Sequence, residues 1–225
     1  MAEACDNERG TYVEQQTVHL YVFDTLADWE PGYAIAGLNS RSDRYRVMTV
    51  AERKVPVRTS GGVTILPDLA LDELEPAHSA MLILPGGDGW DMGKNTAALD
   101  CAQRFLAAGV PVAAICGATA GLARAGILDN VKHTSNALAY IQTTNYSGSA
   151  LYQDQPAVTD GDVITASSTA PLDFAYQIFK RLAVFPPEML EAWYGLFSTG
   201  DPAYFEQMTA LASAAQTDEQ SAVVG

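Results

Sequence analysis

Val110-Pro-Val-Ala-Ala-Ile-Cys116-Gly-Ala-Thr-Ala-Gly-Leu-Ala-Arg-Ala-Gly126 is the stretch that decides the fold. Its first part, residues 110–115, is uniformly apolar, which is typical of a strand buried on both faces of a parallel sheet. The residues after Cys116 are small and helix-forming as far as Gly126. The stretch therefore predicts a strand that turns into a helix at the cysteine.

A thiol at such a turn has two chemical advantages. The positive end of the helix stabilises the thiolate, and free backbone N–H groups can bind an oxyanion. We interpret Cys116 as a candidate nucleophile. From the pattern alone, a buried structural cysteine is the alternative, because free cysteine is among the most buried residue types.

Strand and helix alternate elsewhere in the chain as well. Apolar and β-branched runs predict strands at 17–23, 45–50, 63–66, 78–84 and, as a hairpin around Asp160-Gly161, 157–166. Apolar residues at helical spacing predict helices after Pro31, from Asn95 or Thr96 to Gly109, and from Pro171 to Leu182, with a helical turn at 68–74. This order predicts an α/β fold in which helices cover both faces of a mostly parallel sheet and ligands bind at the carboxyl ends of the strands.

We expect one large α/β domain over residues 17–185, because 225 residues suit a single core. A flexible N-terminal segment, 1–16, precedes it. A helical extension, 186–215, follows with two amphipathic helices, and residues 216–225 are expected to be disordered.

The composition excludes several classes of protein. With 13 basic and 27 acidic side chains the net charge is −14, which repels nucleic acid and anionic lipid. No apolar run is long enough to span a membrane, and residues 1–16 lack the features of a signal peptide, so we expect a cytoplasmic protein. The three cysteines, Cys5, Cys101 and Cys116, are expected to be thiols.

Three separated motifs resemble the ThiJ/PfpI superfamily, over about residues 17–183. They are Ala113-Ala-Ile-Cys116 with its small-residue helix, Leu82-Ile-Leu-Pro85-Gly86-Gly87, and Glu30 after the first strand. The resemblance implies a flavodoxin-like three-layer sandwich of the glutamine-amidotransferase-like type, with the cysteine on a strained elbow. It also implies a homodimer.

The same resemblance implies roles for further residues. Glu30 matches an acid that hydrogen-bonds the cysteine and could shuttle a proton; otherwise it is a first-turn acid favoured by the helix dipole. Backbone N–H groups of Gly86 and Gly87 are expected to form an oxyanion hole with Gly117. Trp90 would line the substrate pocket, or simply pack. Asp24 and Asp28 are lesser candidates on the loop of Glu30.

His133 is the histidine that we single out, because it follows the elbow helix where family members carry a polar residue near the thiol. Thr134 or Ser135 could occupy that position instead, and a surface histidine is the other alternative. His19 and His78 lie in predicted strands and are expected to be core or edge residues.

Two departures from the family narrow the function. Gly117 stands where protease-annotated relatives have histidine, and no His-x-Glu pair of the glutamine amidotransferases follows, so peptidase and glutaminase activities are disfavoured. Scattered cysteines predict no metal site, and we expect no required cofactor. We expect a cysteine-dependent enzyme for a small electrophilic substrate, of hydratase, glyoxalase or deglycase type. The alternatives are a redox-responsive protein whose Cys116 is oxidised to sulfinate, and a non-catalytic binding scaffold.

Overall fold

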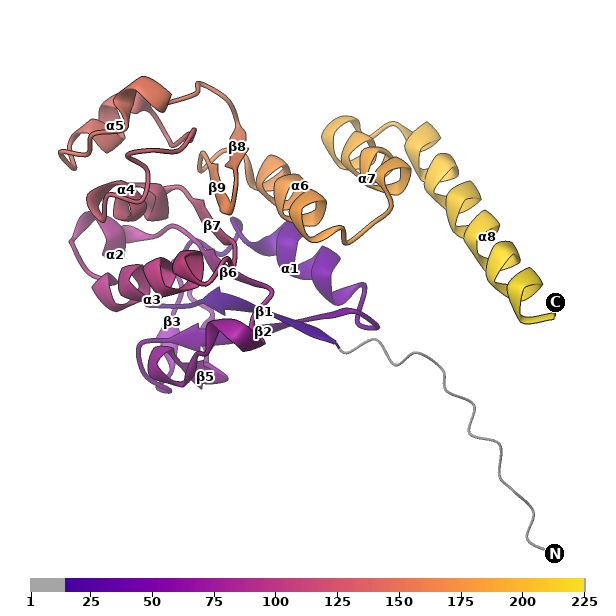
Figure 1. The fold of residues 1–225 in the computed structure, drawn as a ribbon, viewed down its shortest axis with the longest axis horizontal. Helices are drawn as coiled ribbons and strands as arrows, with labels where there is room; N and C mark the ends of the chain where they lie inside the picture. Colours follow the sequence, from indigo (N-terminus) through magenta and orange to yellow (C-terminus); the bar gives the residue numbers. More distant parts are fainter. Residues whose placement is uncertain (1–14, 225) are drawn as a thin grey trace, which may run out of the picture.

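A seven-stranded sheet forms the centre of the molecule, in the order β5-β2-β1-β6-β7-β9-β8 (Figure 1). The structure is a computed structural model and describes residues 15–224. Only β8 pairs antiparallel, with β9, and the other neighbouring strands are parallel. The strands are β1 (Gln16–Tyr21), β2 (Tyr45–Ala51), β5 (Leu69–Ala70), β6 (Met81–Leu84), β7 (Val112–Ile115), β8 (Ala157–Asp160) and β9 (Val163–Ala166), and β3 (Val57–Arg58) pairs with β4 (Thr64–Ile65) in a separate hairpin.

Helices cover both faces of this sheet. Helices α1 and α6 pack against each other on one side, and α2, α3 and α4 lie together on the other (Figure 1). The bounds are α1 (Gly32–Asn39), α2 (Asp88–Asp91), α3 (Thr96–Ala107), α4 (Gly117–Arg124), α5 (Leu138–Gln142), α6 (Pro171–Leu182), α7 (Pro187–Thr199) and α8 (Pro202–Val224), with short 3-10 turns η1 (Leu71–Glu73), η2 (Pro76–His78) and η3 (Ser149–Leu151). The predicted three-layer α/β sandwich is confirmed.

Strand β7 explains why residues 110–115 are uniformly apolar. It lies between β6 and β9 in the sheet, and its four residues have no exposed surface. A parallel strand covered on both faces cannot alternate polar and apolar residues. The chain beyond it starts α4, so Cys116 lies at the carboxyl edge of the sheet.

Several local predictions differ from the structure. The expected strand 78–84 begins only at Met81, because Pro76 starts the turn η2 that contains His78. The stretch 68–74 contains the short edge strand β5 before its helical turn. Helix α5 was not predicted.

The C-terminal helices extend away from the sheet. Helix α7 packs on α6, and α8 packs on α7 and projects from the body of the molecule (Figure 1). The expected disorder from residue 216 differs from the structure, in which α8 continues to Val224. Ala, Glu and Gln in that stretch favour a helix. Residues 1–14 of the expected flexible segment lie outside the described residues, whereas Gln16 already belongs to β1.

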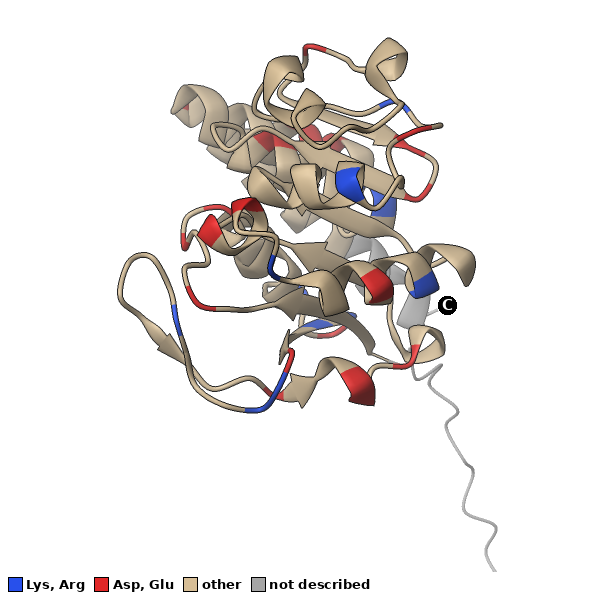
Figure 2. Ribbon diagram, turned by 90° about the vertical axis from the view of Figure 1, so that its left-hand side faces the viewer, with Lys and Arg blue, Asp and Glu red and all other residues tan. Residues whose placement is uncertain are grey.

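Acidic side chains are spread over helices and loops on both halves of the molecule (Figure 2). Among residues 15–224 no helix combines the length and the apolar character needed to cross a membrane.

The contact between α1 and α6 depends on a glycine. A Cβ on Gly37 would lie 2.1 Å from the ring of Phe179, which is fully buried. Phe179 also makes edge-to-face contacts with Phe185 and Trp193, which join α6 to α7. The ring therefore connects the domain to its helical extension.

Replacing this ring with a methyl group is expected to destabilise the protein. Phe179→Ala should lower the free energy of unfolding by about 3–5 kcal/mol, because it removes buried area and leaves a cavity. Urea denaturation followed by circular dichroism measures the change. Phe205→Ala is the matched control, since Phe205 is 62% exposed on α8, and it should cost less than about 0.5 kcal/mol. Equal losses in the two variants would contradict the assigned packing.

Candidate active site

Cys116 occupies a strained turn between β7 and α4. Its backbone has φ 59° and ψ −126°, a conformation that costs an L-residue about 1–3 kcal/mol. Its N–H donates to the Ala166 carbonyl at 3.0 Å. Its own carbonyl accepts from the N–H and the hydroxyl of Thr119, at 3.1 and 2.6 Å. Three hydrogen bonds thus hold the predicted elbow.

Glu30 reaches the thiol from the loop between β1 and α1. Its side chain is fully buried, and Oε2 accepts a hydrogen bond from the Gly86 N–H at 2.5 Å. A Cβ on Gly86 would lie 2.7 Å from Glu30 Oε2 and 2.9 Å from Cys116 Sγ. Only glycine fits there, and the structure brings Glu30, Gly86 and Cys116 together.

Burial controls the protonation of both acids. It raises the pKa of Glu30 to about 7, although hydrogen bonds with Cys116 and the Gly86 N–H act in the opposite direction. Burial and then the charge of Glu30 raise the pKa of Cys116 to about 11. The amide of Asn136 and the Gly117 N–H lower it. Near neutral pH the pair therefore holds at least one proton, which either group can carry.

Asn136 is the residue at this site that the sequence did not reveal to us. Its Nδ2 donates to Cys116 Sγ at 3.5 Å, and its Oδ1 accepts from the Ser168 N–H at 2.9 Å. It ends the polar stretch 131–136 from which we singled out His133. The stretch itself was therefore the signal, but the residue within it that meets the thiol depends on the path of the loop.

His133 does not meet the thiol, and it is not a surface residue either. It is fully buried, its Nδ1 is bonded to the Val131 carbonyl at 2.8 Å, and its Nε2 to the Tyr146 hydroxyl at 3.2 Å. Both ring nitrogens are therefore occupied. Ser135 comes closer to the elbow, because its hydroxyl is 2.6 Å from that of Thr119.

Trp90 packs inside the protein, which is the second of the two roles that the sequence left open for it. The side chain is fully buried, and its indole N–H donates to the Pro85 carbonyl at 2.8 Å. A Cβ on Gly117 would lie 3.3 Å from Trp90 and from the Gly87 carbonyl. The space beside Gly117 is therefore occupied by Trp90 and the Gly87 carbonyl of the protein.

The expected oxyanion hole needs one correction. The Gly86 N–H already donates to Glu30, so it is not available to a substrate. The Gly117 N–H acts on the thiol directly, since it lowers the pKa of Cys116. Gly87, at φ 152°, packs against the Thr25 carbonyl and remains a predicted donor.

Asp24 and Asp28, the two lesser acidic candidates, form hydrogen bonds with a hairpin. Asp28 Oδ2 accepts from the Gly61 N–H at 2.6 Å, and Asp24 Oδ1 accepts from the Arg58 N–H at 2.7 Å. Both carboxylates therefore hold the β3–β4 hairpin to the loop that carries Glu30. In the part of the chain that the structure describes, no three His, Cys, Asp or Glu side chains are arranged to hold a metal ion.

Comparison with known proteins gives consistent matches over the same region. The sequence model of the DJ-1/PfpI family matches residues 16–181. The uncharacterized protease YoaZ of Bacillus subtilis is 43% identical over 87% of this chain and 97% of its own length. A protein named deglycase from Thermococcus kodakarensis is 28% identical over 63% of this chain and 85% of its own. The crystal structure of a thiJ/pfpI family protein from Bacillus anthracis superimposes with a TM-score of 0.83 at 42% identity, covering 88% of this chain and 97% of that one.

Removal of the Glu30 charge is expected to lower the pKa of the Cys116 thiol. In Glu30→Gln the pKa of Cys116 should fall, because a carboxylate in contact with the sulfur opposes formation of the thiolate. The pH dependence of alkylation by iodoacetamide, read by mass spectrometry at Cys116, measures this pKa. Asp28→Asn is the control: the Asp28 carboxylate lies on the same loop but accepts a hydrogen bond from the Gly61 N–H. This variant should leave the pKa of Cys116 unchanged. An unchanged or raised thiol pKa in Glu30→Gln would contradict the described contact.

Proposed function

The chain belongs to the DJ-1/PfpI family, and on that premise we propose that it is a cysteine-dependent enzyme that acts on a small electrophilic substrate. The reaction would be of hydratase, glyoxalase or deglycase type. The observation that carries this proposal is the contact of the Glu30 carboxyl, the Gly86 N–H and the Cys116 thiol at the elbow. It combines a nucleophile with an acid whose pKa of about 7 suits proton transfer near neutral pH.

The first chemical step follows from this arrangement. In the reactive form of the pair, Cys116 is the thiolate and Glu30 is protonated. The sulfur forms a bond to the carbonyl carbon of the substrate, and the π electrons of the C=O bond move to its oxygen. The Glu30 proton passes to that oxygen, which leaves a hemithioacetal and a carboxylate. Glu30 Oε1 has no hydrogen-bond partner among the described residues, so this oxygen can take the role.

Two donors can stabilise the developing charge. The Gly117 N–H and the Asn136 amide both act on the sulfur, so an oxygen bonded to the carbon next to that sulfur comes within their reach. Fixed donors of this kind commonly make the largest contribution to such reactions. Asn136 is held at the site by the Ser168 N–H, which follows β9, whereas Glu30 follows β1.

The composition of the site favours carbonyl chemistry over peptide hydrolysis. The relative YoaZ is named a protease, and the Thermococcus relative is named a deglycase. Cysteine peptidases use a histidine beside the thiol to protonate the leaving amine. His19, His78 and His133, the three histidines of the chain, form no hydrogen bond with Cys116. We retain the further predictions of a homodimer, a cytoplasmic location and no required cofactor.

Turnover of methylglyoxal, a small 2-oxoaldehyde, tests the proposal. Cys116→Ala should abolish its consumption as followed by proton NMR. Glu30→Gln should lower kcat by about 100-fold or more, because general acid–base catalysis typically contributes at least this factor. Cys101→Ala is the matched control, since Cys101 is buried in α3, and it should turn over as the wild type does. Unaltered turnover in Cys116→Ala, or no turnover by the wild type of any carbonyl or isonitrile tested, would contradict the proposal.

A second candidate is oxidation sensing by the same thiol. It is favoured by the difference between the two described cysteines, because Cys101 is buried and Cys116 is partly exposed beside Glu30. After mild treatment with hydrogen peroxide, mass spectrometry should find sulfinate selectively at Cys116, without turnover of carbonyl substrates. Equal oxidation of Cys101 and Cys116 would argue against a sensor.

A further inference from the structure

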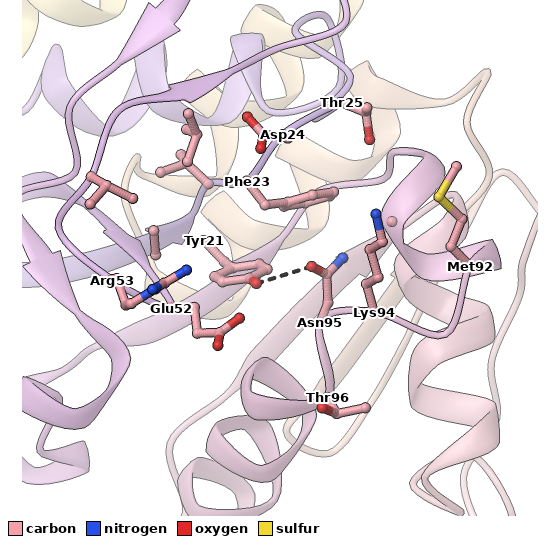
Figure 3. A pocket seen from close by; sticks show the side chains of 15 residues that line it. Tyr21, Phe23, Asp24, Thr25, Glu52, Arg53, Met92, Lys94, Asn95 and Thr96 are labelled. Atoms are coloured by element: carbon pink, nitrogen blue, oxygen red, sulfur yellow. Dashed lines mark hydrogen bonds between the residues drawn. The ribbon is translucent and has the colours of Figure 1, made fainter.

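A cavity lies at the carboxyl ends of β1 and β2, apart from the thiol. It has a volume of about 440 Å³, and its walls come from the loop after β1, the end of β2 and the segment between α2 and α3 (Figure 3). Cys116 and Glu30 are not among its lining residues. Phe23 and Trp90, whose rings are in edge-to-face contact at 5.9 Å, separate the cavity from the elbow.

The cavity lies at a position where α/β sheets bind ligands. Strand β1 lies between β2 and β6, and the helices that follow β1 and β6 pack on opposite faces of the sheet. At such a switch the connections diverge and leave a crevice at the carboxyl ends of the strands. The loops after β1 and β6 carry Glu30 and Gly86 of the thiol site, and the cavity lies beside them, where the ends of β1 and β2 supply other residues.

Charged side chains of both signs line this cavity. Arg53 and Lys94 lie on opposite sides of Tyr21, and Asp24 and Glu52 also border it (Figure 3). None of these four forms an ion pair with another described residue. A ligand that carries both a positive and a negative group would complement such a set, whereas a simple anion or cation would face repulsion from half of it.

Unpaired buried atoms and exposed apolar groups are further features of the same walls. Thr25 Oγ1 and Asn95 Nδ2 are two of the three buried side-chain atoms in the described chain without a hydrogen-bond partner; the third is Glu30 Oε1. The Thr25 and Asn95 atoms have almost no accessible surface, so they are unsatisfied groups within the walls and not contacts that a ligand in the cavity would reach. Val55 and Met92 are 50% and 63% exposed at the rim, where they offer contacts to an apolar group.

We propose that this cavity binds a small zwitterion with an apolar body, of the α-amino acid type. Its carboxylate would pair with Arg53 or Lys94, and its ammonium group with Glu52 or Asp24. Its side chain would lie against Val55 and Met92. The proposal is independent of the chemistry at Cys116, because the two sites share no lining residue.

Isothermal titration calorimetry of the full chain with L-phenylalanine tests this site. Two analogues each lack one charge: N-acetyl-L-phenylalanine has no ammonium group, and phenethylamine has no carboxylate. L-Phenylalanine should bind, and each analogue should bind about tenfold or more weakly, since a charge-assisted hydrogen bond is lost. Shifts in the amide NMR spectrum should be centred on Thr25, Arg53 and Asn95.

Variants assign the binding to the cavity. Arg53→Met and Glu52→Gln should each weaken the binding of L-phenylalanine by about tenfold. Lys54→Met is the matched control, because Lys54 forms an ion pair with Glu73 at 3.7 Å, and it should bind as the wild type does. Cys116→Ala should also bind normally, so failure of the thiol chemistry leaves this test intact.

Three results would overturn the proposal. The first is no heat and no spectral shift with L-phenylalanine at concentrations up to about 10 mM. The second is equal binding of either singly charged analogue. The third is an equal loss of affinity in Lys54→Met and Arg53→Met.

Discussion

The hydrogen bond from the Gly86 N–H to Glu30 is the contact on which the candidate site depends. It joins the loop after β1 to the loop after β6, and it holds a carboxyl group without exposed surface against the thiol. An isolated buried carboxylate is costly, so the group keeps a proton to higher pH than usual. The backbone bond therefore fixes the position of the acid, and burial raises the pH up to which the acid carries a proton.

Parallel strand order brings these loops together. Strands β1, β6 and β7 are neighbours in the sheet, so their carboxyl ends place Glu30, Gly86 and Cys116 side by side although they are far apart in sequence. The same edge also bears the charged cavity beside β2. Phe23 and Trp90 fill the space between the two, so that the sheet presents two chemically different surfaces at one edge.

The sequence predicted the parts of this architecture that depend on local pattern. A fully apolar run marked β7, and the small residues behind Cys116 marked α4; family resemblance added Glu30. The sequence did not predict the contact of Asn136 with the thiol, and it did not predict α5. The segment after α4 has no clear periodicity, and its course depends on contacts with distant loops. The Gly86 N–H was wrongly expected to face substrate, and the two roles of Trp90 stayed open, for a related reason. Whether a group faces substrate or protein is decided by tertiary packing, which no local motif specifies.

The strained backbone of Cys116 has a consequence for the stability of the protein. Glycine adopts a φ of 59° without the steric cost that an L-residue meets. A chain that needed only the fold would gain stability by carrying glycine at the elbow, since nothing in β7 or α4 requires a side chain there. Under the proposed function, the strain at this turn is a cost in stability that accompanies a reactive thiol, as in proteins whose active sites are less stable than the fold alone allows.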